Sequence, residues 1–286
     1  MPELPEVESL VRFLREKAAG LTVSRAELAA FAALKTYDPP LDRLVGRTVT
    51  GCDRRGKFLL VALDPLWLVF HLARGGWLRW SDPLPEARAK PGKSPLALRI
   101  GFEGGAGFDV TEAGTEKRLA IYVVRSVDDI ENVAALGPDP LDAAFGLDEF
   151  AAALRAQGGQ VKIALTTQSV VAGVGNAYSD EALHTAGLSP FKNAAKITDD
   201  EVARLHAAVV SILTDAVERS AGLPAAGIKS EKKSGLRVHG KAGQKCPVCG
   251  DVIRTVSFAT KSLQYCAGCQ TGGKPLADRR LSRLLK

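Results

Sequence analysis

The sequence lacks the long hydrophobic runs of a membrane protein. Its longest apolar stretches, such as 58–63 and 66–70, are far shorter than the roughly 20 residues that a transmembrane helix needs. It also lacks a basic segment followed by an apolar one at its start, because the third residue is already acidic. With 46% hydrophobic and 24% charged residues, the chain has an ordinary globular balance. We therefore predict a cytoplasmic protein with no membrane partner, and neither a disordered chain nor a secreted disulfide scaffold.

Charge is modest overall but unevenly distributed. The net charge is +6, yet residues 226–286 hold 13 Lys and Arg against 3 Asp and Glu. The rest of the chain holds 25 basic and 29 acidic side chains, so it is slightly acidic. A basic C-terminal region on such a body indicates a polyanionic partner. The alternative is a solvated surface that is merely basic.

Four of the five cysteines form two pairs whose spacing predicts a metal site. Cys246 and Cys249 make one C-x2-C pair, and Cys266 and Cys269 make the second after sixteen intervening residues. Two such pairs can complete a tetrahedral sulfur site for one zinc ion. Four sulfur ligands leave no open position, so this ion is structural. The alternative, two disulfides, is disfavoured in a chain without an export signal.

The residues around these pairs predict a small β-hairpin. Apolar residues between the pairs indicate two short strands around a turn at 260–262. The fifth cysteine, Cys52, stands alone and is predicted to be a small buried residue.

Hydrophobic periodicity separates a β-rich part from a helical part. A helix is predicted over 5–19, where apolar residues share one face and Gly20 follows. Short alternating segments then predict an antiparallel β-sandwich or barrel, with strands at 57–63, 67–73, 96–102, 107–111 and 119–124. Beyond a connection at 136–146 the predicted helices are 147–157, 161–168, about 177–186 and 198–219. The last of them opens with Thr198 and Glu201 at capping-box spacing.

The N-terminus carries groups suited to covalent chemistry on a sugar. If Met1 is removed, Pro2 presents a secondary amine, and α-amino groups titrate near pH 8. Its attack on a sugar C1′ would give an iminium intermediate. Glu3 and Glu6 lie within one helical turn, where a carboxylate can transfer a proton. The alternative is an ordinary helix start with Pro and acidic residues in its first turn.

A glycine-rich turn at 172–176 predicts a phosphate site. Glycines such as Gly175 let backbone N–H groups approach an anion, and the following helix N-terminus adds its dipole. Lys162 and Asn176 are the side chains expected to assist. A plain turn between two packed helices explains the same pattern.

Taken together, these segments resemble the formamidopyrimidine-DNA glycosylase / endonuclease VIII family of base-excision repair enzymes. The motifs MPELPEVE, LGPDPL, VAGVGNAY and LRVHGKAG resemble the family's N-terminal, interdomain, helix–two-turn–helix and zinc-finger motifs; they begin at residues 1, 136, 171 and 236. The resemblance spans nearly the whole chain. It implies an α+β fold: an N-terminal helix plus antiparallel β-sandwich catalytic domain (1–132), a helix–two-turn–helix DNA-binding domain (133–225) and a basic zinc-finger region with a β-hairpin (226–286).

The resemblance also implies roles for individual residues. Pro2 would be the Schiff-base nucleophile and Glu3 the general acid, and Lys57 would assist strand cleavage at the DNA backbone. Lys261, at the basic position of the finger, would reach the lesion phosphate and assist the second elimination. The residues implied to contact DNA are Glu6, His71, Arg74, Lys162, Gly175, Asn176 and Lys261. The partner would be damaged DNA. The protein would act as a monomer and would flip a base out of the duplex.

Several positions depart from the family's pattern. The finger's arginine position holds Lys261, which keeps the charge but loses the planar fork. Arg74 stands where the family has an apolar wedge, and the segment 112–118 has no phenylalanine where the family inserts Arg and Phe into the opposite strand. Ser94 stands where many members carry histidine, and 222–236 looks shorter than the loop that covers 8-oxoguanine.

These departures lead to one main function and two alternatives. The main prediction is a bifunctional DNA glycosylase and abasic-site lyase that acts by β/δ-elimination, with a substrate choice different from 8-oxoguanine enzymes. A non-catalytic damaged-DNA-binding protein of the same fold is the first alternative. A ribosome- or RNA-associated role is the second, and it leaves the N-terminal motif unexplained.

Overall fold

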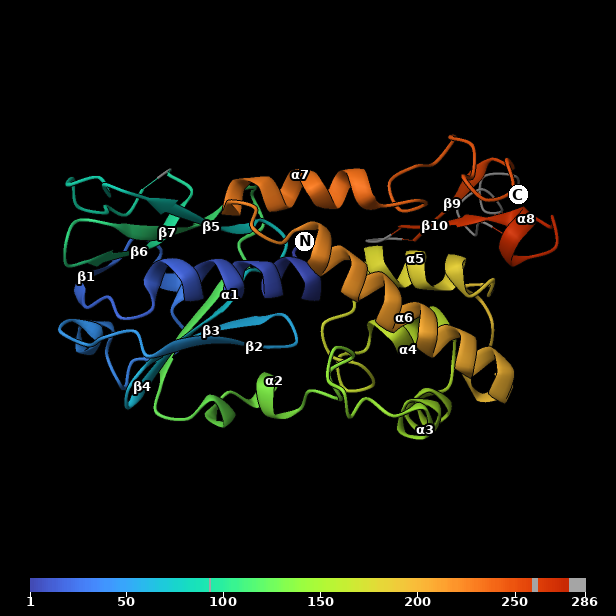
Figure 1. The fold of residues 1–286 in the computed structure, drawn as a ribbon, viewed down its shortest axis with the longest axis horizontal. Helices are drawn as coiled ribbons and strands as arrows, with labels where there is room; N and C mark the ends of the chain where they lie inside the picture. The colour runs from blue at the N-terminus through green and yellow to red at the C-terminus, as the bar shows by residue number, and fades with distance from the viewer. Residues whose placement is uncertain (93, 259–261, 278–286) are drawn as a thin grey trace. The chain divides into compact units, whose positions relative to one another are not determined.

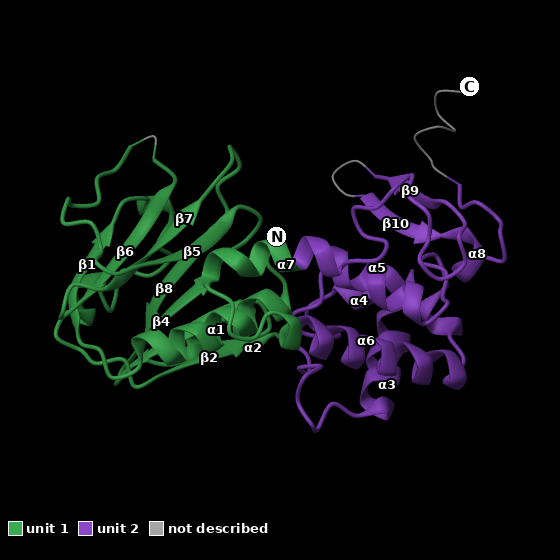
Figure 2. Ribbon diagram, turned by 45° about the horizontal axis from the view of Figure 1, so that its top comes forward, with its two compact units in different colours: residues 1–136, 217–231 green, residues 137–216, 232–286 purple. Residues whose placement is uncertain are grey.

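The computed structural model describes residues 1–92, 94–258 and 262–277, and the chain forms two compact units (Figure 2). Unit 1 comprises residues 1–136 and 217–231, and unit 2 comprises residues 137–216 and 232–286. The basic finger thus belongs to the same unit as the central helices. The predicted division into three domains stays a prediction.

Unit 1 is a β-sandwich of two antiparallel four-stranded sheets (Figure 1). One sheet has the order β1-β6-β7-β5 and the other the order β2-β3-β4-β8. The strands are β1 (Val23–Leu28), β2 (Gly51–Arg55), β3 (Phe58–Leu63), β4 (Leu66–His71), β5 (Gly76–Ser81), β6 (Leu96–Phe102), β7 (Gly107–Glu112) and β8 (Ala120–Val124). Short helical elements are η1 (Phe31–Ala33), η2 (Leu41–Leu44), η3 (Val127–Asp129) and α2 (Glu131–Ala134).

Helix α1 (Leu4–Ala18) packs one face into the core of this sandwich. Val7, Leu10, Val11 and Leu14 recur at helical spacing and are completely buried. They join side chains from both sheets in one continuous core, which fixes the position of the helix and therefore of the chain's N-terminus.

Unit 2 contains the helices that follow residue 136 and a small hairpin (Figure 1). Its helical elements are α3 (Leu147–Gln157), α4 (Val161–Thr166), α5 (Asn176–Thr185), η4 (Ala194–Lys196) and α8 (Ala267–Gln270), with most of α6 (Asp199–Arg219) and the end of α7 (Ala225–Gly235). The hairpin pairs β9 (Ile253–Ser257) with β10 (Ser262–Cys266). Helix α6 begins with the predicted capping box, since the Glu201 N–H donates to Thr198 Oγ1 and the Thr198 N–H donates to Glu201 Oε2.

The predicted fold class is confirmed, with omissions. The helices at the N-terminus and in the central part lie within one to two residues of their predicted bounds, and Cys52 is buried. Strands β1, β2 and β5 were not predicted, and 222–236, expected as a short loop, contains helix α7. Within the described part of the chain, no helix is long and apolar enough to cross a membrane.

Candidate functional site

The N-terminal residues are held by a reciprocal cap at the start of α1. The Glu3 N–H donates to Glu6 Oε2 at 2.7 Å, and the Glu3 carboxylate accepts from the Glu6 N–H. Both side chains are almost fully buried. Pro2, directly before this cap, is buried as well, whereas Met1 is half exposed. The first turn therefore places two carboxylates at the positive end of a helix dipole, directly after the buried Pro2 in the chain.

The turn that carries Lys57 is attached to the same helix. Arg54 Nε lies 3.2 Å from Glu8 Oε2 on α1, and Arg54 Nη1 donates to the Gly56 carbonyl. Burial raises the pKa of Glu8, but hydrogen bonds and charge from Arg12 and Arg54 outweigh it and lower the pKa. Lys57 follows Gly56 in the turn between β2 and β3 and is 8% exposed. The ion pair thus sets Lys57 in position relative to α1.

His71 lies next to Lys57 because of the strand register. Phe58, the residue after Lys57, pairs with His71 across β3 and β4, and their ring centroids are 4.9 Å apart. Burial and the positive charge of Lys57 lower the pKa of His71 to about 4. The imidazole is therefore neutral at pH 7 and can donate one hydrogen bond without adding a charge.

We expect this low pKa to make unit 1 less stable in acid. The unfolded chain takes up the proton near pH 6.5 and the folded protein only near 4, so the unfolded state binds more protons between these values. The stability that the neutral His71 contributes is complete above pH 6.5 and is lost as the pH falls toward 4. Between about pH 7 and pH 4.5 the loss is about 2 kcal/mol. Urea unfolding of His71→Gln should show a pH dependence smaller by this amount, and an NMR titration of the His71 ring with a midpoint near 6.5 would contradict the assignment.

Arg74 lies in the turn between β4 and β5, beside the segment that follows β7. Arg74 Nη1 and Arg118 Nη2 both approach Glu116 Oε2, at 3.8 and 3.4 Å, and all three side chains are exposed. Ala73, just before Arg74, has φ of +47°, a left-handed conformation that costs a non-glycine residue about 1 kcal/mol. The two segments thus present two arginines that share one carboxylate at the surface.

Lys162 is buried in unit 2 and bonded to the start of α5. Its Nζ donates to the Asn176 carbonyl at 3.2 Å, to Ser179 Oγ at 2.8 Å and to Asp180 Oδ1 at 2.5 Å. The Asn176 side chain, half exposed at the first position of α5, donates to the Ser262 carbonyl at 2.8 Å. Lys162 thus holds the start of α5 in place.

Two acidic residues of α5, Glu181 and Asp180, bind the finger to the helix. Glu181 accepts hydrogen bonds from the backbone N–H groups of three successive residues, Arg237, Val238 and His239. Asp180 lies 2.7 Å from His239 Nδ1 and accepts from the Gln264 N–H. These buried carboxylates fix the segment that enters the finger and one strand of its hairpin.

The four predicted ligand cysteines converge in the finger. Sγ of Cys246 lies 3.8 Å from Sγ of Cys269, and Sγ of Cys249 lies 3.3 Å from Sγ of Cys266. A tetrahedral site with zinc–sulfur bonds of about 2.3 Å has sulfurs about 3.8 Å apart. None of the four thiols forms a disulfide. The donor set therefore fits one structural zinc ion, as predicted.

A histidine of α5 also faces this cluster. His184 is 4% exposed, and its Nε2 lies 3.3 Å from Cys246 Sγ. Burial, together with the charge of Arg237, lowers its pKa, so the imidazole is neutral at pH 7.

The predicted site residues thus form separate groups within each unit. In unit 1 the structure brings Pro2, Glu3 and Glu6 together and sets Lys57 beside His71. In unit 2 it joins Lys162 to Asn176 and gathers the cysteines. Lys261 lies outside the described residues.

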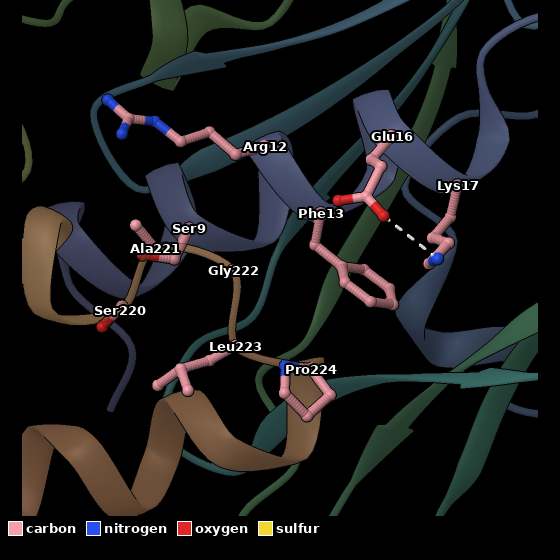
Figure 3. A pocket seen from close by; sticks show the side chains of 10 residues that line it. All are labelled: Ser9, Arg12, Phe13, Glu16, Lys17, Ser220, Ala221, Gly222, Leu223 and Pro224. Carbon is pink, nitrogen blue, oxygen red and sulfur yellow. Dashed lines mark ion pairs between the residues drawn. The ribbon is translucent and has the colours of Figure 1, made fainter.

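A surface pocket in unit 1 contains none of these described site residues. It has a volume of about 270 Å³ and lies between α1 and the chain before α7, with Arg12, Phe13 and Leu223 among its lining residues (Figure 3). It therefore lies apart from the residues gathered at the start of α1.

Sequence reasoning missed the roles of Asp180, His184 and His239. For Asp180 and His184 the signal was weak, since single polar residues in an amphipathic helix normally face solvent. The helix from 176 to 185, however, is buried along nearly its whole length, so its polar residues need partners inside the protein.

Three family models match the sequence. Residues 1–114 match the formamidopyrimidine-DNA glycosylase N-terminal domain, and residues 136–225 match the H2TH domain of the same glycosylase. Residues 243–272 match a zinc finger found in FPG and IleRS.

Curated relatives match this chain over most of its length or over about half of it. A formamidopyrimidine-DNA glycosylase of Variovorax paradoxus is 38% identical over 94% of this chain and 100% of its own. An uncharacterized formamidopyrimidine-DNA glycosylase-like protein of Mycobacterium tuberculosis is 57% identical over 53% of this chain and 95% of its own.

Solved structures have the same fold. The MutM (FPG) protein of Thermus thermophilus has a TM-score of 0.79 at 31% identity, covering 96% of this chain and 100% of that one. Lactococcus lactis FPG in complex with DNA containing FAPY-dG has a TM-score of 0.83 at 27% identity, covering 94% and 100%.

Proposed function

Because the chain belongs to the formamidopyrimidine-DNA glycosylase family of DNA-repair enzymes, we propose that it is a bifunctional DNA glycosylase and abasic-site lyase acting through Pro2. The observation that carries the proposal is the first turn of α1. There Pro2 is buried directly before the reciprocal cap of Glu3 and Glu6, at the positive end of the helix. This arrangement suits a nucleophilic nitrogen with a proton donor beside it.

In the proposed reaction the free Pro2 nitrogen attacks C1′ of the damaged nucleotide. The N–C1′ bond forms while the bond between C1′ and the base breaks, and Glu3 supplies a proton as the sugar ring opens. The resulting iminium makes the C2′ proton acidic, so removal of that proton expels the 3′ phosphate, and a second elimination expels the 5′ phosphate. Hydrolysis of the iminium then returns the free amine.

The remaining predicted residues would hold the DNA backbone. Lys57 supplies a positive charge, whereas the neutral His71 supplies a hydrogen bond. In unit 2, Asn176 and the N–H groups at the start of α5 suit a phosphate. Lys162 would act indirectly, by holding the start of α5 in place, since its own Nζ is directed at three oxygens of the protein. Lys261 would add a charge from the finger.

Zinc contributes to this function by folding the finger. Cys246, Cys249, Cys266 and Cys269 would hold the ion, and four sulfur ligands would leave no position for substrate. We propose that the enzyme acts as a monomer on chromosomal DNA.

We further propose that lesion choice differs from that of 8-oxoguanine enzymes. Arg74 is a cation at the wedge position, and with Arg118 it shares the carboxylate of Glu116. Guanidinium groups stack on bases and bind phosphates, but they fill an apolar gap poorly. Such a surface favours abasic, single-stranded or bulky adducted sites.

The test is a panel of DNA duplexes containing 8-oxoguanine, an oxidised pyrimidine or an abasic site. We expect cleavage at the abasic site to be faster than at 8-oxoguanine by at least about 10-fold, or about 1.4 kcal/mol of transition-state stabilisation. Arg74→Met, which places an apolar side chain at the wedge position, should reduce the ratio of the cleavage rate at the abasic site to that at 8-oxoguanine. The matched control is Arg125→Met, because Arg125 is another exposed arginine of unit 1 that pairs with a carboxylate, that of Asp38. Rapid 8-oxoguanine excision with ordinary opposite-base discrimination would refute the altered choice.

A non-catalytic damaged-DNA-binding protein is the second candidate. It is favoured by the surface ion pair between Arg74 and Glu116, because an arginine held by a carboxylate suits DNA binding better than it suits extrusion of a base. The two candidates differ in whether a covalent complex with DNA can form, which reductive trapping measures.

A further inference from the structure

The zinc site has five candidate donors rather than four. His184 comes from α5, far from both cysteine pairs in sequence, and its Nε2 lies 3.3 Å from Cys246 Sγ. The ligand atoms of His184, Cys246, Cys266 and Cys269 all lie within 4.8 Å of one another. Such a set has the composition of a Cys3His zinc site, which is an established structural type.

Cys249 differs from the other three cysteines in its position. It is exposed, whereas Cys246 and Cys266 are buried and Cys269 is partly buried. Its Sγ contacts Cys266 at 3.3 Å, but it is not part of the mutually close group that contains His184. Cys249 therefore occupies the solvent side of the cluster, and His184 occupies the protein side.

We propose that His184 is a reserve ligand of the structural zinc, which takes the fourth position when the Cys249 thiolate is lost. Three buried or partly buried cysteines and the imidazole would then hold the ion. Loss of any of those three cysteines cannot be compensated in the same way, because Cys249 lies outside the group that His184 completes.

We expect His184 to stay unligated while the Cys249 thiolate is present, because that thiolate is the better zinc ligand of the two. Its Nδ1 is buried with no hydrogen-bond partner in the described part of the chain. Zinc-bound histidines normally donate the other ring N–H to an acceptor, so ligation here leaves that group unpaired. While Cys249 is bound, His184 Nε2 instead stays within hydrogen-bond distance of the Cys246 sulfur, at 3.3 Å.

The experiment compares four full-length variants, namely Cys249→Ala, His184→Phe, the double variant of these two, and Cys266→Ala. Alanine supplies no donor atom, and phenylalanine keeps the volume of the ring. Zinc content and affinity are measured by competition with a chelator, and Co²⁺ replaces zinc for visible absorption spectroscopy. Thermal unfolding checks that each chain is folded.

We expect Cys249→Ala to keep one zinc ion and to give a cobalt spectrum of three sulfurs and one nitrogen. His184→Phe alone should keep the four-sulfur spectrum. The double variant should bind zinc at least about 100-fold more weakly than Cys249→Ala. A loss of affinity of this size is larger than the loss expected when only an outer-shell partner of a zinc ligand is removed. Cys266→Ala should lose the ion although His184 is present.

Two results would overturn the proposal. One is that Cys249→Ala loses zinc, whether or not the chain stays folded. The other is that Cys249→Ala keeps zinc equally well with and without His184, with no nitrogen contribution in the cobalt spectrum. None of these measurements depends on glycosylase or lyase activity, so the outcome is separate from that of the proposed function.

Discussion

Replacing Pro2 by glycine is expected to reduce borohydride trapping on abasic DNA by at least about 100-fold, in the range attributed to single groups that take part directly in the chemistry. Trapping reduces the iminium to a stable amine, so it reports the covalent bond and not DNA affinity. Glycine keeps a primary amine but loses the secondary amine and the fixed ring before the cap of Glu3. The measurement is the fraction of protein that migrates with labelled DNA on a denaturing gel.

The control for this prediction is the state of the N-terminus. As long as Met1 is attached, the Pro2 nitrogen is an amide and cannot attack. Mass spectrometry of the active preparation should therefore show a chain that begins at Pro2, and salt-dependent DNA binding should be the same for wild type and variant. A trapped complex formed by a chain that retains Met1, or by Pro2→Gly at the wild-type rate, would end the assignment of Pro2 as nucleophile.

Removal of the zinc is expected to abolish tight DNA binding. Structural zinc sites bind with apparent free energies of about 10–16 kcal/mol in finger peptides, which is comparable to the stability of a whole domain. Without the ion, the two cysteine pairs are no longer joined through a metal, and Glu181 loses the ordered segment whose three N–H donors it binds. We therefore expect Cys246→Ser to unfold the finger and to weaken DNA binding by at least about 100-fold.

The matched variant for this prediction is Cys52→Ser. Cys52 is also a buried cysteine, but it lies on β2 in unit 1 and has no part in the metal site. Its replacement should leave zinc content and the salt dependence of DNA binding unchanged. Fluorescence anisotropy with a labelled abasic duplex, together with zinc analysis, measures both variants. Retention of zinc and full affinity by Cys246→Ser would refute the role of the finger.

The agreement between prediction and structure depends on how local each signal is. Helix α1 was predicted because Val7, Leu10 and Leu14 show the helical period within one element. Strand β5 was missed, since it follows directly after the turn that carries Arg74 and its pairing with β7 joins distant residues. Helix α7 was missed as well, because it has a weak apolar pattern and contains two glycines.

The sequence by itself determined which reactive groups the protein carries and how they are spaced: a proline beside glutamates at the N-terminus, four cysteines at zinc spacing and a basic C-terminal region. These are properties of short segments, so residue identity and spacing are enough to indicate them. Only the tertiary structure decided that His71 is neutral, that Lys162 is directed into the protein and that His184 faces the metal site. Each of those properties depends on burial and on partners distant along the chain, which no local pattern contains.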